Sequence, residues 1–206
     1  MARTLYEKYL HNLGILEADL RDKRVLDVGA GSRFFAAHVL KENITTEIFS
    51  LDPVVRSRPA SKLAWESIDE EVQKKVDART VKAVKESIPL KDESIDLVLA
   101  NCMNKSKHAK SYEEAQELQK EIEDMFGEFL RVLAPGGEVR IFGLKREESP
   151  KRELENLRWR GGIMAKLAEL KKQGFKVAIE MVQKENIQPG GSLMVWDRVV
   201  VRKPKS

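Results

Sequence analysis

A glycine turn preceded by an aspartate is the first group of residues whose types and spacing suggest chemistry. Residues 27–32 read Asp-Val-Gly-Ala-Gly-Ser and follow a short apolar run. Glycine lets the backbone turn tightly and approach a ligand with no Cβ in the way. A dinucleotide fingerprint requires glycine at position 34, which is Phe34 here, and Asp27 suits a cationic ligand better than a pyrophosphate. The alternative is a turn that merely joins a strand to a helix.

A second carboxylate, Asp52, ends the next apolar run, some 20 residues past the glycines. A carboxylate at this place can accept hydrogen bonds from both hydroxyls of a ribose. The alternative is that Asp52 is a turn residue before Pro53. Its pairing with the glycine turn favours ligand binding.

Histidine and cysteine offer weaker candidates. His108 follows a predicted strand and is a weak candidate for a catalytic base, the alternative being a solvated loop residue. His11 could cap the site from the opening helix, whereas we interpret His38 as a packing residue. Cys102 could form a covalent adduct with a pyrimidine, but the residue before it is Asn101 and not the proline of the enzymes that do so.

The elements that must position these residues alternate between strand and helix. Alternation predicts right-handed crossovers and an α/β, doubly wound sheet with helices on both faces, whose ligands bind at the carboxyl ends of the strands. The last two strands are too close in sequence to be parallel. Pro135-Gly136-Gly137 is expected to end the fourth helix. The patterns predict strands over 24–28, 47–51, 81–84, 95–100, 138–142, 176–182 and 193–201, and helices over 5–16, 34–40, 62–76, 112–133 and 154–173.

Composition places the chain among globular proteins. It has 206 residues, 42% hydrophobic and 34% charged, and no apolar run long enough for a membrane helix. The first residues lack the apolar segment of a signal peptide, so we expect a cytoplasmic protein with no membrane partner. One cysteine excludes an internal disulfide, and we expect no metal site. We predict one domain over 1–206, with an N-terminal helix (1–22), a ligand-binding core (23–144) and a final helix and two strands (145–206).

Charge is distributed unevenly along the chain. Basic residues outnumber acidic ones from residue 145 onward, whereas residues 1–144 carry a slight acidic excess. The stretch 145–162 interleaves Lys and Arg with Trp159 and follows a predicted strand. It could receive an RNA backbone or an anionic small substrate. The alternative is the solvated face of a helix.

Five stretches, in matching order and spacing, resemble the class I S-adenosylmethionine-dependent methyltransferases, in particular their small single-domain, type 11-like branch. The resemblance implies a Rossmann-like seven-stranded sheet with the last strand antiparallel, and S-adenosyl-L-methionine as cofactor. It implies methyl transfer to O, N or C of a small metabolite by in-line displacement. The alternatives are an RNA or protein methyltransferase that uses the basic C-terminal third, and an inert cofactor-binding protein. The stretches are Val25–Gly31, Ser50–Asp52, Ser87–Leu90 with Ser94–Val98, Leu130–Gly137 and Gly174–Val177.

The resemblance also implies roles for residues near the glycine turn. Asp27 would lie near the methionine amino group, through a water. Gly29, Ala30 and Gly31 would present their backbone to the amino-acid part of the cofactor. Asp52 would hold the ribose, with Pro53 beside it, and the backbone carbonyl of Asn101 would lie near the methionine amino group.

The resemblance also implies which residues lie beside the adenine, and it shows two positions at which this sequence departs from the family pattern. Lys85 and Glu86 would line the adenine, and Asp96 is a structural landmark. Arg33 replaces the third glycine of the family and could crowd the loop. Val84 replaces an acidic residue that binds the adenine amino group, for which Glu86 could substitute. Substrate, attacked atom, general base and oligomeric state stay open.

Overall fold

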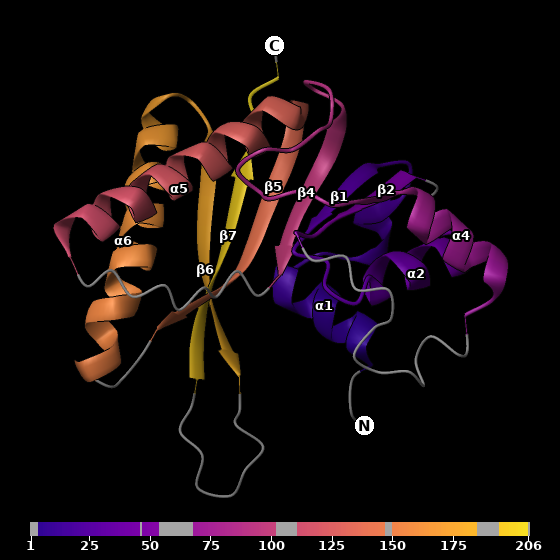
Figure 1. Cartoon of the computed structure of the whole chain (residues 1–206), viewed down its shortest axis with the longest axis horizontal. Helices are drawn as coiled ribbons and strands as arrows, with labels where there is room; N and C mark the ends of the chain where they lie inside the picture. Colours follow the sequence, from indigo (N-terminus) through magenta and orange to yellow (C-terminus); the bar gives the residue numbers. More distant parts are fainter. Residues whose placement is uncertain are drawn as a thin grey trace, which may run out of the picture.

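The computed structural model of the chain describes residues 4–45, 47–53, 68–101, 111–146, 150–184 and 194–205. Within these ranges seven strands form one sheet in the order β3-β2-β1-β4-β5-β7-β6 (Figure 1). The strands are β1 (Arg24–Val28), β2 (Glu47–Leu51), β3 (Thr80–Val81), β4 (Ile95–Asn101), β5 (Leu133–Arg146), β6 (Lys176–Lys184) and β7 (Met194–Arg202). The helices are α1 (Leu5–Leu13), α2 (Phe34–Lys41), α4 (Glu70–Ala78), α5 (Tyr112–Val132) and α6 (Pro150–Lys172), with a 3-10 turn, η1, at Glu17–Leu20.

The sheet has the predicted mixed topology. Strand β1 pairs in parallel with β2 on one side and β4 on the other, while β7 runs antiparallel to both β5 and β6. The doubly wound α/β fold with an antiparallel last strand is therefore confirmed. The strand order reverses between β1 and β4, which is where such sheets bind ligands, beyond the carboxyl ends of the strands.

Helices pack on both faces of the sheet, each over its own core cluster. Helices α1, α2 and α4 share a cluster with Val25, whereas α5 and α6 share the other cluster with Leu26 and Val28. Because successive side chains of a strand point to opposite faces, Asp27 lies on the face of Val25, toward α1 and α2. Figure 1 shows α1, α2 and α4 grouped beside β1 and β2, and α5 and α6 beside the C-terminal strands. In the ranges described, no helix is both long and apolar enough to cross a bilayer.

Several predicted boundaries are wrong for local reasons. Strand β3 covers only Thr80–Val81, because the chain then turns toward α5, where the Ile88 N–H donates to Glu128 Oε2 at 2.7 Å. Helix α1 ends at Leu13, since Gly14 adopts the left-handed conformation at φ 63°. Helix α4 begins after Asp69, whose side chain caps the Val72 N–H at 2.8 Å, while residues 62–67 of the predicted helix lie outside the described ranges.

The stretch Pro135-Gly136-Gly137 does not end a helix. Helix α5 already ends at Val132, and Leu133 opens β5 in extended conformation. The three residues instead occupy a break in the β4–β5 register, between the pairs formed by Ile95 and Leu97. The regular β4 pairing of β5 therefore starts at Glu138, as the sequence predicts.

Candidate functional site

The glycine turn and Asp52 meet beyond the carboxyl ends of β1 and β2. The N–H groups of Gly29 and Ala30 donate to the Leu51 carbonyl at 2.8 and 3.2 Å. The Gly31 N–H donates to Asp52 Oδ2 at 2.9 Å. The structure therefore brings together the two features that the sequence separates by two elements, and Pro53 follows directly on the exposed side.

Open space lies in front of the turn. Gly29 has φ 70°, and a Cβ built on it would meet no atom within 4 Å among those of the structure. Gly31 also has a positive φ, 52°, so both positions favour glycine for their conformation. A ligand can therefore approach the bare backbone of the turn.

Asp27 is buried and only half satisfied. It is 1% exposed, and its Oδ1 accepts a hydrogen bond from the Tyr9 hydroxyl. Its Oδ2 has no hydrogen-bond partner within the described part of the chain. The pKa of Asp27 is raised to about 7, chiefly by burial; the Tyr9 hydrogen bond lowers it and the nearby Asp52 carboxylate adds to the rise. A buried acceptor without a donor costs about 1–3 kcal/mol, so this oxygen favours a ligand that brings a donor or a positive charge.

Helix α1 lies beside the turn and forms one wall of an open cavity of about 390 Å³. Tyr9 and Asn12 line it from α1, opposite Gly29, Ala30 and Asn101. Asn12 Nδ2 donates to Asn101 Oδ1 at 3.2 Å, which ties the helix to the end of β4. Figure 1 shows α1 beside the ends of β1 and β4.

Sequence reasoning missed Tyr9 and Asn12 because it assigned the opening helix only an apolar stripe. The available signal was a pair of polar-tipped residues spaced i, i+3, which share one side of a helix. His11, the predicted cap, has an exposed side chain and contributes its backbone carbonyl to Arg198 instead. Tyr9 and Asn12 are among the residues of α1 that cover the site.

Lys85 and Glu86 lie in a separate charged cluster. Lys85 is buried, and its Nζ bonds to Glu86 and to Glu121 Oε1 of α5 at 2.6 Å. The ammonium also lies 5.7 Å from the ring centroid of Trp159. Neither Lys85 nor Glu86 lines the cavity under α1, so their role beside an adenine stays a prediction. Val84, at the position of the missing acidic residue, is exposed.

Arg33 does not enter the cavity. It has φ 56°, and its buried guanidinium bonds to Asp77 of α4 and to Thr80 Oγ1 at 3.3 Å. The side chain therefore points to α4 and the start of β3 and leaves the glycine turn open. At the position of the family's third glycine, the backbone of Arg33 adopts the left-handed conformation that a glycine would favour.

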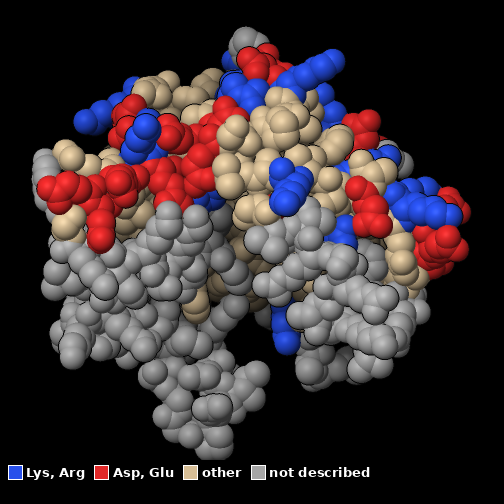
Figure 2. Space-filling model, in the orientation of Figure 1, with Lys and Arg blue, Asp and Glu red and all other residues tan. Residues whose placement is uncertain are grey.

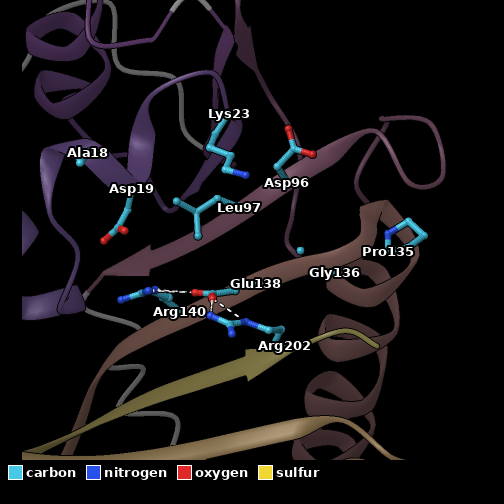
Figure 3. A pocket seen from close by; sticks show the side chains of 11 residues that line it. Ala18, Asp19, Lys23, Asp96, Leu97, Pro135, Gly136, Glu138, Arg140 and Arg202 are labelled. Atoms are coloured by element: carbon cyan, nitrogen blue, oxygen red, sulfur yellow. Dashed lines mark hydrogen bonds and ion pairs between the residues drawn. The ribbon is translucent and has the colours of Figure 1, made fainter. Parts of the chain in front are cut away.

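Charged residues near the amino ends of the parallel strands pair with one another. Asp96 Oδ2 accepts from the Arg24 N–H and Nε at 2.9 and 3.0 Å, which fits the structural role expected of Asp96. A hollow of about 320 Å³ lies beside it, where Arg140 and Arg202 both bond to Glu138 (Figure 3). The Arg24–Asp96 pair joins β1 to β4, and the Arg202–Glu138 pair joins β7 to β5.

In the basic stretch 145–162, the described side chains of Trp159 and Arg160 pack against the protein and are not fully exposed on its surface. Trp159 is buried in the core under α6, and Arg160 Nε donates to the buried Asp197 Oδ2 at 2.7 Å. Trp159 is therefore not exposed for stacking on a base. Figure 2 shows acidic side chains gathered over α5 with basic ones interspersed, and the exposed acidic residues of α5 are Glu113, Glu114, Glu117, Glu123 and Asp124.

The remaining candidates fall into two groups. His38 packs as predicted: its ring stacks on Tyr6 with centroids 3.9 Å apart, and burial lowers the pKa of its imidazole. His108 and Cys102 lie outside the described residues, so the structure assigns neither of them a place.

Comparison with known proteins gives the following matches. A family model described as a methyltransferase domain matches residues 26–141, more than half of the chain. A SAM-dependent methyltransferase structure from Methanosarcina mazei matches with a TM-score of 0.56 and 13% identity, over 96% of this chain and 97% of that one. Another from Archaeoglobus fulgidus matches with a TM-score of 0.53 and 14% identity, over 97% and 100%. Curated protein sequences gave no match.

Proposed function

Because the chain belongs to the methyltransferase-domain family and uses S-adenosylmethionine as cofactor, we propose that it transfers the cofactor's methyl group to an O, N or C atom of a small metabolite. The observation that carries the proposal is the convergence of the glycine turn, Asp27 and Asp52, where Asp52 binds the Gly31 N–H and Asp27 binds the Tyr9 hydroxyl of α1. Two carboxylates lie at the turn, and in their ionised form they suit a cationic cofactor.

The residues present fit this cofactor in three respects. Open space in front of Gly29 admits an amino-acid group against the bare backbone. The unpartnered Asp27 Oδ2 suits an ammonium group, directly or through a water. Asp52, at the turn, suits the two hydroxyls of a ribose. Gly29–Gly31, Asp27 and Asp52 would therefore hold the cofactor, with Asn101 beside the amino group and Lys85 and Glu86 toward the adenine.

When bound, S-adenosylmethionine supplies a methyl group that its sulfonium has already activated. The chain contributes position and orientation, which are the main requirements of a displacement in line. Helix α1 covers one side of the turn, since the Tyr9 hydroxyl donates to Asp27 and Asn12 Nδ2 donates to Asn101. A general base is needed only where the attacked atom must lose a proton, and no described residue is assigned that role.

Two observations favour a small substrate over RNA. Trp159, the aromatic residue of the basic stretch, is buried and unavailable for stacking. The exposed acidic residues of α5 would repel a phosphate backbone from that surface. A metabolite that reaches the cavity beneath α1 needs neither feature.

Incubation with methyl-labelled S-adenosylmethionine tests this function. The protein is mixed with a small-metabolite extract, with total RNA and with a protein lysate, and label is counted in each fraction. We expect label in the small-metabolite fraction, and less of it with Asp52→Ala at limiting cofactor. Label in RNA or protein instead would contradict the small-substrate class, and cofactor binding without transfer in any fraction would indicate an inert binding protein.

A further inference from the structure

Helix α1 contributes a hydroxyl to the buried carboxylate of Asp27, beside the glycine turn. Tyr9 OH donates to Asp27 Oδ1, while the other oxygen, Oδ2, is buried and unpartnered among the described residues. We propose that Tyr9 is a positioning residue, which fixes the Asp27 carboxylate and stabilises its ionised form so that Oδ2 receives the ammonium group of S-adenosylmethionine. The proposal rests on the proposed function and makes α1 part of the cofactor site.

A purely structural role for Tyr9 explains less of the geometry. Its ring already stacks on Phe35, with centroids 4.1 Å apart, and this packing does not need the hydroxyl. A buried carboxylate kept only for stability would have both oxygens hydrogen-bonded, because an unsatisfied acceptor is costly. One oxygen that is hydrogen-bonded and one that is buried without a partner among the described residues are the arrangement expected of a group that awaits a donor.

The surroundings of Asp27 leave few other groups to control its charge. Tyr9 faces it from α1 and Asp52 from the end of β2, and these are the titratable groups that act on it. Its neighbours in the sheet register are Ser50 on β2 and Leu99 on β4, and neither of them is ionisable. Lys8, on α1, is exposed where it lines the same cavity. Phe35 covers the site from α2.

The position of Tyr9 is fixed by contacts at the other end of its helix. Arg198 Nε donates to the Asn12 carbonyl at 2.9 Å, and Arg198 Nη2 donates to the His11 carbonyl at 2.5 Å. Arg140 Nη1 bonds to the Gly14 carbonyl. These cations satisfy the carbonyls that the end of a helix leaves open and hold α1 against β5 and β7.

Tyr9→Phe tests the proposal, with Tyr6→Phe as matched control. Both variants remove one hydroxyl from the same helix and keep the ring. The Tyr6 hydroxyl is buried with no hydrogen-bond partner within the described ranges, so its removal should leave the site unchanged. Affinity for S-adenosylmethionine is measured by calorimetry between pH 5.5 and 8. The ligand's own amino group titrates in the same way with every variant, so differences between variants report on the protein.

In the wild type, affinity should rise with pH as Asp27 ionises, because the ionised form binds the ammonium group. Tyr9→Phe should move the midpoint of this rise upward by about one pH unit, which corresponds to roughly tenfold weaker binding below the midpoint. Tyr6→Phe should keep the wild-type midpoint. Asp27→Asn should abolish the midpoint, and adding Tyr9→Phe to Asp27→Asn should have no further effect on affinity.

Each other outcome overturns a specific statement. Equal affinity of the wild type and Tyr9→Phe at every pH, or a loss in Tyr9→Phe that is uniform with pH, would show that the hydroxyl does not act through the charge of Asp27. Should Tyr9→Phe fail to fold, a pH midpoint retained in Asp27→Asn would overturn the proposal instead. A wild type that binds no S-adenosylmethionine would overturn the proposed function, which is a distinguishable result.

Discussion

Gly29→Ala should weaken cofactor binding while the protein stays folded. An added Cβ at Gly29 meets no atom within 4 Å, so the fold has room for it. The cost is backbone strain at φ 70°, about 1–2 kcal/mol for an L-residue in the left-handed region. For a domain of this size, that lowers the melting temperature by roughly 2–8 °C.

The loss of cofactor affinity in Gly29→Ala should have a cause of its own, separate from the loss of folding stability. The methyl group would project into the space that the cofactor's amino-acid part must occupy, and inserting a methyl group into a packed contact costs about 1–3 kcal/mol. This corresponds to a dissociation constant raised roughly 5- to 150-fold. Calorimetric titration with S-adenosylmethionine measures the change.

Gly174→Ala is the matched control for this prediction. Gly174 also has a positive φ, 92°, and also has open space around a built Cβ, but it lies between α6 and β6, away from the turn. It should lose comparable stability and keep wild-type affinity. Unchanged affinity in Gly29→Ala, or an equal loss in Gly174→Ala, would refute the reasoning that the turn lies against the cofactor.

Three further changes give distinct readouts. Asp52→Ala should weaken cofactor binding by roughly 1–3 kcal/mol in the same titration, and an unchanged dissociation constant would exclude the ribose role. Asp27→Asn should raise the melting temperature at pH 8, because the pKa of Asp27 is about 7 in the fold and about 3.9 in the unfolded chain, so that ionisation destabilises the fold. This gain should shrink as the pH falls from 7 to 4, and a gain independent of pH would contradict the cause. Arg198→Ala should lower the opening free energy of α1 in hydrogen exchange by roughly 1–3 kcal/mol, whereas Arg202→Ala, near the amino ends of the parallel strands, should leave α1 protected.

Local sequence patterns predicted the sheet, the glycine turn after β1 and the carboxylate, Asp52, after β2. Val25–Gly31 and Ser50–Asp52 carry their strands and turns within a few residues, so spacing alone places Asp52 beside the glycines. The topology then follows from the alternation of strands and helices. These features depend on neighbours in sequence, which is why they could be read without coordinates.

The part of the site formed by α1 depends on contacts between residues far apart in the sequence, which no local sequence pattern contains. Tyr9 reaches Asp27 because α1 docks on the sheet, and one residue that holds the helix there, Arg198, lies far along the chain. The same holds for Lys85, whose partner Glu121 lies on a helix two elements later. Both depend on how helices pack on the sheet, and the apolar stripe of a helix predicts that it packs but not which polar tip it brings to a neighbour.

A crystal structure grown with S-adenosylhomocysteine at millimolar concentration tests the central claim most directly. The account predicts the amino-acid part against Gly29–Gly31, its amino group toward Asp27 and the ribose hydroxyls on Asp52. A well-ordered protein whose turn carries no ligand under these conditions, or a ligand bound away from Asp27 and Asp52, would contradict it.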